Sequence, residues 1–193
     1  MFHLAKITLD EDGQMTLYCA GLNDGHPDRP GEDETRHGNA GAKSPNVWFV
    51  PTPDEVVRAM LELARVSSDD VVIDLGSGDG RIAIAAACDY GARAVGLELN
   101  PDLLRQSSEI SKQRGVSHLT TFVQEDLFSY DLREATVVTL YLLPEMNLQL
   151  RPKLLRELQP GARIVSHAFD MADWIPDQRA EVDGRYLYVW IIV

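Results

Sequence analysis

Glycines alternate with polar and acidic residues in the segment Asp74-Leu75-Gly76-Ser77-Gly78-Asp79-Gly80, which includes the end of the apolar run 71–75. Glycine at alternate positions lets the backbone turn sharply and approach a ligand without clashes from Cβ atoms. The Ala-rich stretch 81–89 that follows is typical of a helix, whose first N–H groups would point at that ligand. A strand, a glycine-rich turn and a helix in this order predict a ligand-binding site at the turn.

The spacing of the glycines restricts the ligand. A dinucleotide site has the pattern G-x-G-x-x-G, whose third glycine would fall here at Arg81, and no G-K-[ST] follows, which excludes a phosphate-binding P-loop. Asp74 precedes the turn, where a carboxylate would repel a pyrophosphate but attract a cation. S-adenosylmethionine carries a sulfonium and an α-amino group and no phosphate, so we expect it to be the ligand.

Two further acidic residues follow the next two apolar runs. Glu98 lies near the end of the run 92–99, where a carboxylate can accept hydrogen bonds from both hydroxyls of a ribose. Asp126 comes shortly after the run 119–124 and could accept a hydrogen bond from an adenine amino group. An isolated acid at either place would more simply be a helix cap or a solvated loop residue. Three acids at the tips of consecutive strands favour a ligand site.

The elements that position these residues alternate between strand and helix after residue 46. Apolar runs typical of buried strands cover 71–75, 92–99, 119–124, 135–143 and 162–169. Helical patterns cover 81–89, 100 to about 114, and 145–158, the last kinked or split by Pro152, and a hairpin at 178–182 and 186–193 turns at Asp183-Gly184. Near-continuous apolar strands separated by helices predict an α/β fold with a parallel sheet that is covered on both faces.

The first helix of this region has a strong start signal. Thr52 is a candidate N-cap, Pro53 suits the first helical position, and Glu55 would complete a capping box. Apolar residues then repeat at helical spacing from Val57 to Ala64. The pattern predicts a helix that begins at Pro53.

The chain divides into three segments. Residues 1–22 predict a β-hairpin, residues 23–46 are rich in Gly, Pro and Asp and predict a flexible linker, and residues 47–193 form the α/β domain. His26 and His37 lie in the linker without acidic or cysteine partners at ligand-like spacing, so we expect no metal site. We expect no signal peptide. No apolar run approaches the ~18 residues needed to span a membrane. The two cysteines lie in unrelated contexts, which weakly favours a cytoplasmic location.

The chain has 193 residues and a net charge of −12. An acidic balance argues against a general nucleic-acid binder, which relies on a basic surface. It would suit a basic protein partner, although the charge could also serve solubility alone. We leave the oligomeric state open, with a monomer as the default expectation.

The stretches FVPTPDEVVRAMLELA, VVIDLGSGDGRIAIAAA, VGLELNP and ATVVTLYLLPEMNLQLRPKLLRELQPGARIVSH together resemble one branch of the seven-β-strand (class I) methyltransferases. That branch contains the archaeal broad-specificity protein lysine methyltransferases and the mitochondrial enzymes that modify the ATP synthase c subunit. The resemblance covers 47–193. It implies a Rossmann-like, doubly wound sheet of seven mostly parallel strands, with helices on both faces and a C-terminal antiparallel hairpin strand.

The resemblance also implies roles for individual residues. Asp74, Gly76, Gly78 and Asp79 would contact the methionine part of the cofactor, Glu98 its ribose and Asp126 its adenine, and residues 50–53 would lie over it. Together with the residue-based reasoning, the expected cofactor-binding set is Thr52, Asp74, Gly76, Ser77, Gly78, Asp79, Gly80, Glu98, Asn100 and Asp126.

The methyl acceptor should enter after the run 135–143. Enzymes that methylate planar amino groups usually carry [DN]-P-P-[YF] there, and Leu142-Leu143-Pro144 offers no such polar clamp. Tyr141 could line the acceptor channel or belong to the core, Glu145 could hold a cationic lysine or be a first-turn acid, and His167 could face the site or be a core residue.

The expected activity is methyl transfer to lysine ε-amines of proteins. The alternatives are a small-molecule or RNA methyltransferase and an inert cofactor-binding module. Trp48 and Phe49 could cover the pocket or simply anchor the linker.

Overall fold

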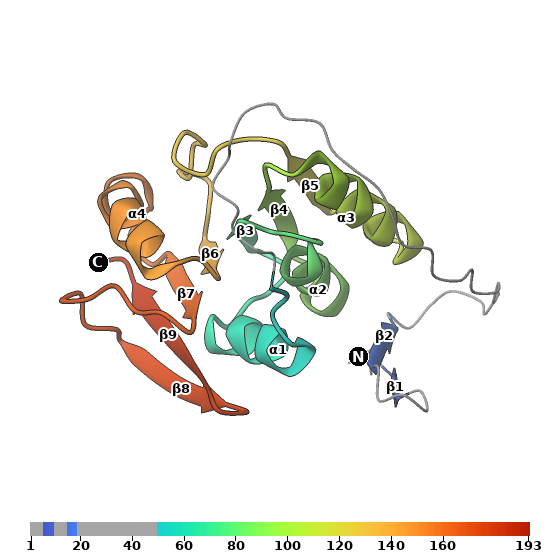
Figure 1. Cartoon of the computed structure of the whole chain (residues 1–193), viewed down its shortest axis with the longest axis horizontal. Helices are drawn as coiled ribbons and strands as arrows, with labels where there is room; N and C mark the ends of the chain where they lie inside the picture. Colours follow the sequence, from blue (N-terminus) through green and yellow to red (C-terminus); the bar gives the residue numbers. More distant parts are fainter. Residues whose placement is uncertain (1–5, 10–14, 19–49) are drawn as a thin grey trace, which may run out of the picture.

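The computed structural model describes residues 6–9, 15–18 and 50–193, and Figure 1 shows its elements. One sheet has the strand order β5-β4-β3-β6-β7-β9-β8. Its strands are β3 (Val71–Leu75), β4 (Arg93–Leu97), β5 (Thr120–Val123), β6 (Val137–Leu140), β7 (Arg163–His167), β8 (Gln178–Val182) and β9 (Arg185–Ile191). Each lies within or at most one residue outside the strand predicted for it, and the seven-stranded fold class is confirmed.

The sheet contains mostly parallel strands and a C-terminal antiparallel hairpin, as predicted. The five strands β3 to β7 pair in parallel, while β9 runs antiparallel to both β7 and β8. Asp183 and Gly184 join β8 to β9 with φ angles of 50° and 71°, the left-handed pair that a two-residue hairpin requires. Strand order reverses between β3 and β6, so a ligand crevice is expected at the carboxyl ends of these two strands.

Helices cover both faces of the sheet, which makes three layers. The helices are α1 (Asp54–Leu63), α2 (Arg81–Tyr90), α3 (Pro101–Gln113) and α4 (Pro144–Glu157). Buried side chains of α1 and α2 pack on one face, and α4 packs on the other face through Leu150 and Leu154. In Figure 1, α4 accordingly stands apart from the other three helices. Because both faces are covered, the central strands β3 and β6 are buried along their whole length and are apolar except for Asp74 and Thr139.

The start of α1 corrects one prediction. Its N-cap is Pro53, and no side chain caps the helix, so neither the Thr52 cap nor the capping box with Glu55 forms. Pro53 lies outside the helix because its ψ of 149° is extended, and its carbonyl accepts the first helical N–H groups. The Thr52 hydroxyl is directed instead to His167, at 3.2 Å. A tertiary contact therefore replaces the local cap.

Helix α4 passes through Pro152 without being split in two. Near the N-terminus, β1 (Lys6–Leu9) and β2 (Met15–Tyr18) pair in antiparallel fashion within the segment predicted as a hairpin. The predicted linker 23–46, with His26 and His37, lies outside the described residues, as do Trp48 and Phe49. Within the described ranges, no helix has both the length and the apolar character needed to cross a bilayer.

Candidate active site

Asp74 lies near the carboxyl end of β3 and is almost completely buried. Thr139 of the neighbouring β6 donates a hydrogen bond of 2.7 Å to its carboxylate. Burial raises the Asp74 pKa from an ordinary 3.8 to about 7, and the nearby charges of Asp79 and Glu98 raise it further against the opposing effect of Thr139. A buried carboxylate with this pKa would be stabilised in its charged form by a bound cation.

The glycine turn after β3 bends sharply, as the sequence predicts. Gly76, Gly78 and Gly80 all have positive φ angles, between 55° and 79°. A Cβ at Gly76 would lie 2.8 Å from Leu142, and one at Gly80 would lie 2.6 Å from the ring of Phe122. The positive φ angles therefore favour glycine at both positions, and at Gly80 the Phe122 ring also leaves no space for a Cβ.

Ser77, in the middle of this turn, provides a direct test of whether the turn fits a polar ligand. Its side chain is buried, yet its hydroxyl has no hydrogen-bond partner among the described residues. Buried polar atoms are normally paired, so an orphaned hydroxyl beside Asp74 fits a ligand with polar groups of its own. The amino and carboxylate groups of a bound methionine moiety meet that requirement.

Glu98 follows β4 and is tied to the turn. Its carboxylate accepts hydrogen bonds from the backbone N–H of Gly78 at 3.0 Å and of Asn100 at 2.9 Å, one on each oxygen. Each carboxylate oxygen has a second lone pair. Glu98 can therefore accept two hydroxyl groups of a ribose while the turn holds it in place.

The last two predicted cofactor residues have local roles as well. The Asn100 side chain caps α3 by accepting a hydrogen bond from the Asp102 N–H at 2.9 Å. Asp126 is exposed after β5, and its carboxylate accepts a hydrogen bond from the Phe128 N–H at 2.9 Å. Asp126 remains open to solvent at the same edge of the sheet as Glu98, whereas the Asn100 side chain already serves the helix.

The side of the crevice where the methyl acceptor is expected lies beyond β6 and β7. Tyr141 directly follows β6, and its ring lies 3.9 Å from the ring of His167, the last residue of β7. His167 is buried, and burial together with the charge of Arg185 lowers its pKa to about 4, so the imidazole is neutral at physiological pH. Glu145 is exposed in the first turn of α4 and forms no ion pair in the described part of the chain.

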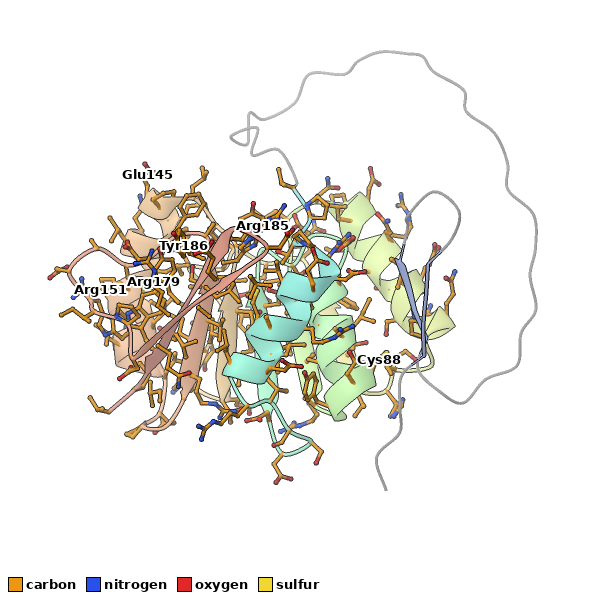
Figure 2. The ribbon with its side chains drawn as sticks, turned by 90° about the horizontal axis from the view of Figure 1, so that it is seen from below. Cys88, Glu145, Arg151, Arg179, Arg185 and Tyr186 are labelled. Carbon is orange, nitrogen blue, oxygen red and sulfur yellow. The ribbon has the colours of Figure 1, made fainter. Side chains whose placement is uncertain are left out.

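Figure 2 shows Glu145 at the start of α4 and Arg185 and Tyr186 at the start of β9, on the side of the molecule away from Cys88 of α2. Because β9 runs antiparallel to β7, its first residues lie beside the carboxyl end of β7. The start of β9 therefore borders the side where the acceptor is expected.

Two residues that sequence reasoning did not select belong to this region. Arg81 binds both carboxylate oxygens of Asp79 and also donates a hydrogen bond of 2.9 Å to the carbonyl of Thr52. Thr139 is the partner of Asp74. A hydroxyl residue inside an otherwise apolar strand was the available signal for Thr139. Arg81 gave no signal, because its partners depend on the tertiary fold.

A groove along the outer side of α2 is a separate feature. It is lined by residues of α1, α2 and α3, and it reaches the glycine turn only through Asp79 and the Arg81 side chain. None of the buried polar atoms described above lines it. The groove is therefore not the crevice that the strand ends form.

Comparison with known proteins identifies the family. Residues 74–178 match the family described as the ANTKMT methyltransferase domain. A protein-lysine N-methyltransferase of Saccharolobus islandicus is 47% identical over 152 residues, which is 75% of this chain and 94% of that protein. The mouse adenine nucleotide translocase lysine N-methyltransferase is 40% identical over 131 residues, 67% of this chain but only 56% of that longer protein.

A solved structure points to the same cofactor. A Salinibacter ruber protein, described as an RNA methyltransferase in complex with S-adenosyl-L-homocysteine, is 54% identical, with a TM-score of 0.73 over 74% of this chain and 94% of that one. The bound molecule is the product that S-adenosylmethionine leaves after methyl transfer. The chain thus belongs to the S-adenosylmethionine-dependent methyltransferases, in the family of the ANTKMT methyltransferase domain.

Proposed function

We propose that this methyltransferase modifies lysine ε-amines of a protein. The observation that carries the proposal is the relative named a protein-lysine N-methyltransferase, which is 47% identical and is spanned almost completely by this chain. The vertebrate relatives are named for lysine methylation as well, although this chain spans just over half of their length. A net charge of −12 would draw lysine-rich partners by long-range attraction.

We also propose a role for each part of the crevice. The glycine turn, Asp74 and Ser77 would hold the methionine part of the cofactor, Glu98 its ribose and Asp126 its adenine. When bound, S-adenosylmethionine supplies a methyl group on a positively charged sulfur that leaves as a neutral thioether. Asp74, ionised once a cation is beside it, would favour the charged cofactor over a neutral analogue.

On the acceptor side, the chain's task is to align a neutral amine with the methyl–sulfur axis and to exclude water. Tyr141 and Leu142 are half-buried and supply apolar surface there. A lysine amine has an ordinary pKa near 10.4, so it must lose a proton before it attacks. His167, with its pKa lowered to about 4, is too weak a base for this step, and the proton is expected to leave to solvent.

A second candidate function is methylation of RNA. It is favoured by one observation, the description of the Salinibacter ruber relative as an RNA methyltransferase. The acidic balance of the chain opposes it, because phosphate binding relies on basic residues.

Transfer of labelled methyl groups separates the two candidates. The purified protein is incubated with tritiated S-adenosylmethionine and a cell extract, and the products are digested with protease or with ribonuclease. We expect label that protease releases and ribonuclease does not, in an amount that rises from pH 7 to pH 9 as the amine deprotonates. Ribonuclease-sensitive label alone would favour RNA. A variant with Asp74→Ala serves as the inactive control.

A further inference from the structure

His167 joins two parts of the active site that come from distant stretches of the chain. Its Nδ1 lies 3.2 Å from the hydroxyl of Thr52, and its ring lies against Tyr141 with a centroid distance of 3.9 Å and a tilt of 31°. Thr52 belongs to the segment 50–53, here named the strap, which precedes α1. Tyr141 directly follows β6, and the surface formed by Tyr141 and Leu142 on the expected acceptor side is here named the acceptor wall.

The strap is also fastened on its other side. The carbonyl of Thr52 accepts a hydrogen bond of 2.9 Å from Arg81, whose guanidinium is held by Asp79 of the glycine turn. Thr52 is 4% exposed although its neighbours Val50 and Pro51 are exposed. One residue of the strap is therefore fixed between the cofactor turn and the end of β7.

Through these contacts, one side chain connects the side of the crevice where the cofactor is expected with the side where the acceptor is expected. The hydrogen bond with Thr52 reaches the side where the cofactor is expected, and the ring contact with Tyr141 reaches the side where the acceptor is expected. Both contacts are made by one imidazole that is almost completely buried, since His167 is 1% exposed. In-line transfer requires the methyl group and the attacking atom to be aligned closely, so small movements of either wall would slow it.

We propose that His167 is a positioning residue that fixes the strap through Thr52 and the acceptor wall through Tyr141. The inference rests on the cofactor and acceptor sides assigned under the proposed function. His167 would take no part in proton transfer. It would set the distance between the two walls across which the methyl group moves.

Two variants of His167 separate its two contacts. His167→Asn keeps a hydrogen-bonding group near the position of Nδ1 but removes the ring, whereas His167→Phe keeps a ring against Tyr141 but removes the hydrogen bond. Thr52→Val removes the same hydrogen bond from the strap side without altering β7, which guards against misfolding at the buried site. The double variant Thr52→Val/His167→Phe completes a double-mutant cycle, which tests whether the two side chains act through one shared contact.

Calorimetry measures the affinity for S-adenosylhomocysteine and so tests the contact between His167 and the strap. No methyl acceptor is needed. We expect Thr52→Val and His167→Phe each to weaken binding about five- to tenfold, the effect of losing roughly one buried hydrogen bond, and the double variant to be no weaker than either single one. His167→Asn should bind within about twofold of the wild type. Multiplying effects in the double variant, or unchanged binding by His167→Phe, would overturn the strap contact.

The rate of methylation of poly-L-lysine tests the contact between the His167 ring and Tyr141 of the acceptor wall. With saturating cofactor, His167→Asn should lose at least about tenfold in kcat, whereas His167→Phe should recover most of the wild-type kcat. A histidine that only stabilises the fold would not give this pattern, in which His167→Phe is impaired in cofactor binding and His167→Asn in kcat. Equal losses in both measurements for both variants would refute the proposal. If the wild type leaves poly-L-lysine unmodified, this polymer is not a substrate, and the mutant cycle in cofactor binding alone tests the role of His167.

Discussion

Replacement of Asp74 by asparagine should stabilise the protein in the absence of cofactor while weakening cofactor binding. The Asp74 carboxylate is buried beside two other acids, and its pKa is raised from 3.8 to about 7. In the unfolded chain it ionises near pH 4, but in the folded protein it keeps its proton until about pH 7. Folding therefore becomes less favourable as the pH rises from about 4 to 7, since the folded state binds the extra proton.

The size of the effect follows from the two pKa values. At 1.36 kcal/mol per pKa unit, the ionised carboxylate opposes folding by roughly 4 kcal/mol at pH 8 and by under ~2 kcal/mol at pH 5. Asparagine keeps the oxygen that Thr139 contacts and has no charge to bury. Any unpaired amide N–H in the variant has the same effect at both pH values. The stabilisation by Asp74→Asn should therefore be about 2–3 kcal/mol larger at pH 8 than at pH 5.

Chemical denaturation of the cofactor-free protein at the two pH values measures this difference. Asp70 at the other end of β3 is a matched control, because it is also buried but accepts hydrogen bonds from Thr136 and Arg163. Burial tends to raise the Asp70 pKa, yet the hydrogen bonds prevail and lower it, so it stays ionised at both pH values. Asp70→Asn should thus destabilise by roughly 3 kcal/mol at pH 5 and pH 8 alike.

The same Asp74→Asn variant should bind S-adenosylmethionine about 10–100-fold more weakly at pH 8, as one charge-assisted interaction is lost. Wild-type affinity should rise as the pH increases toward 7 and then level off, with a proton released on binding. The reasoning would be refuted by a variant whose stability gain does not change with pH, or by one that binds the cofactor as tightly as the wild type.

Three further predictions concern neighbouring features. Glu98→Ala should reduce cofactor affinity by about 1.5–3 kcal/mol in calorimetry while leaving the circular dichroism spectrum unchanged, and an unaltered affinity would remove Glu98 from the site. Gly96→Ala should destabilise the protein by about 1–3 kcal/mol in thermal unfolding, because the added Cβ would lie 2.7 Å from both Phe122 and the Ser77 hydroxyl; a wild-type melting temperature would contradict the packing. A chain that starts at Ser44 should keep native cofactor affinity, and a folded truncation that binds poorly would instead place residues 1–43 in the site.

The order of the elements could be read from the sequence because each pattern has one dominant cause. Strands buried on both faces, such as β3, are apolar apart from a functional residue such as Asp74, and the glycines that follow are favoured for reasons of backbone conformation. Asp74 and Glu98 were identifiable because parallel strands bring their carboxyl ends to one edge. Their places in the chain were sufficient to predict that they lie together.

Contacts between distant segments could not be read in this way. Two similar pairs make the point, since Asn100-Pro101 begins a helix with a side-chain cap, whereas Thr52-Pro53 does not. The local signals are equivalent, but Thr52 has a partner in His167, 115 residues away. The role of Arg81 likewise arises only when the strap and the glycine turn are folded together. Such partners depend on the tertiary fold and leave no periodic pattern.

Identification of the methylated atom tests the central claim most directly. The purified protein is incubated with a cell extract and S-adenosylmethionine whose methyl group carries deuterium, and the modified material is analysed by tandem mass spectrometry. We predict deuterated methyl groups on lysine ε-nitrogens of one or a few proteins, absent with the Asp74→Ala variant. Deuterated methyl groups found on RNA, on a small molecule, or on arginine or carboxylate side chains but never on lysine would contradict the proposal.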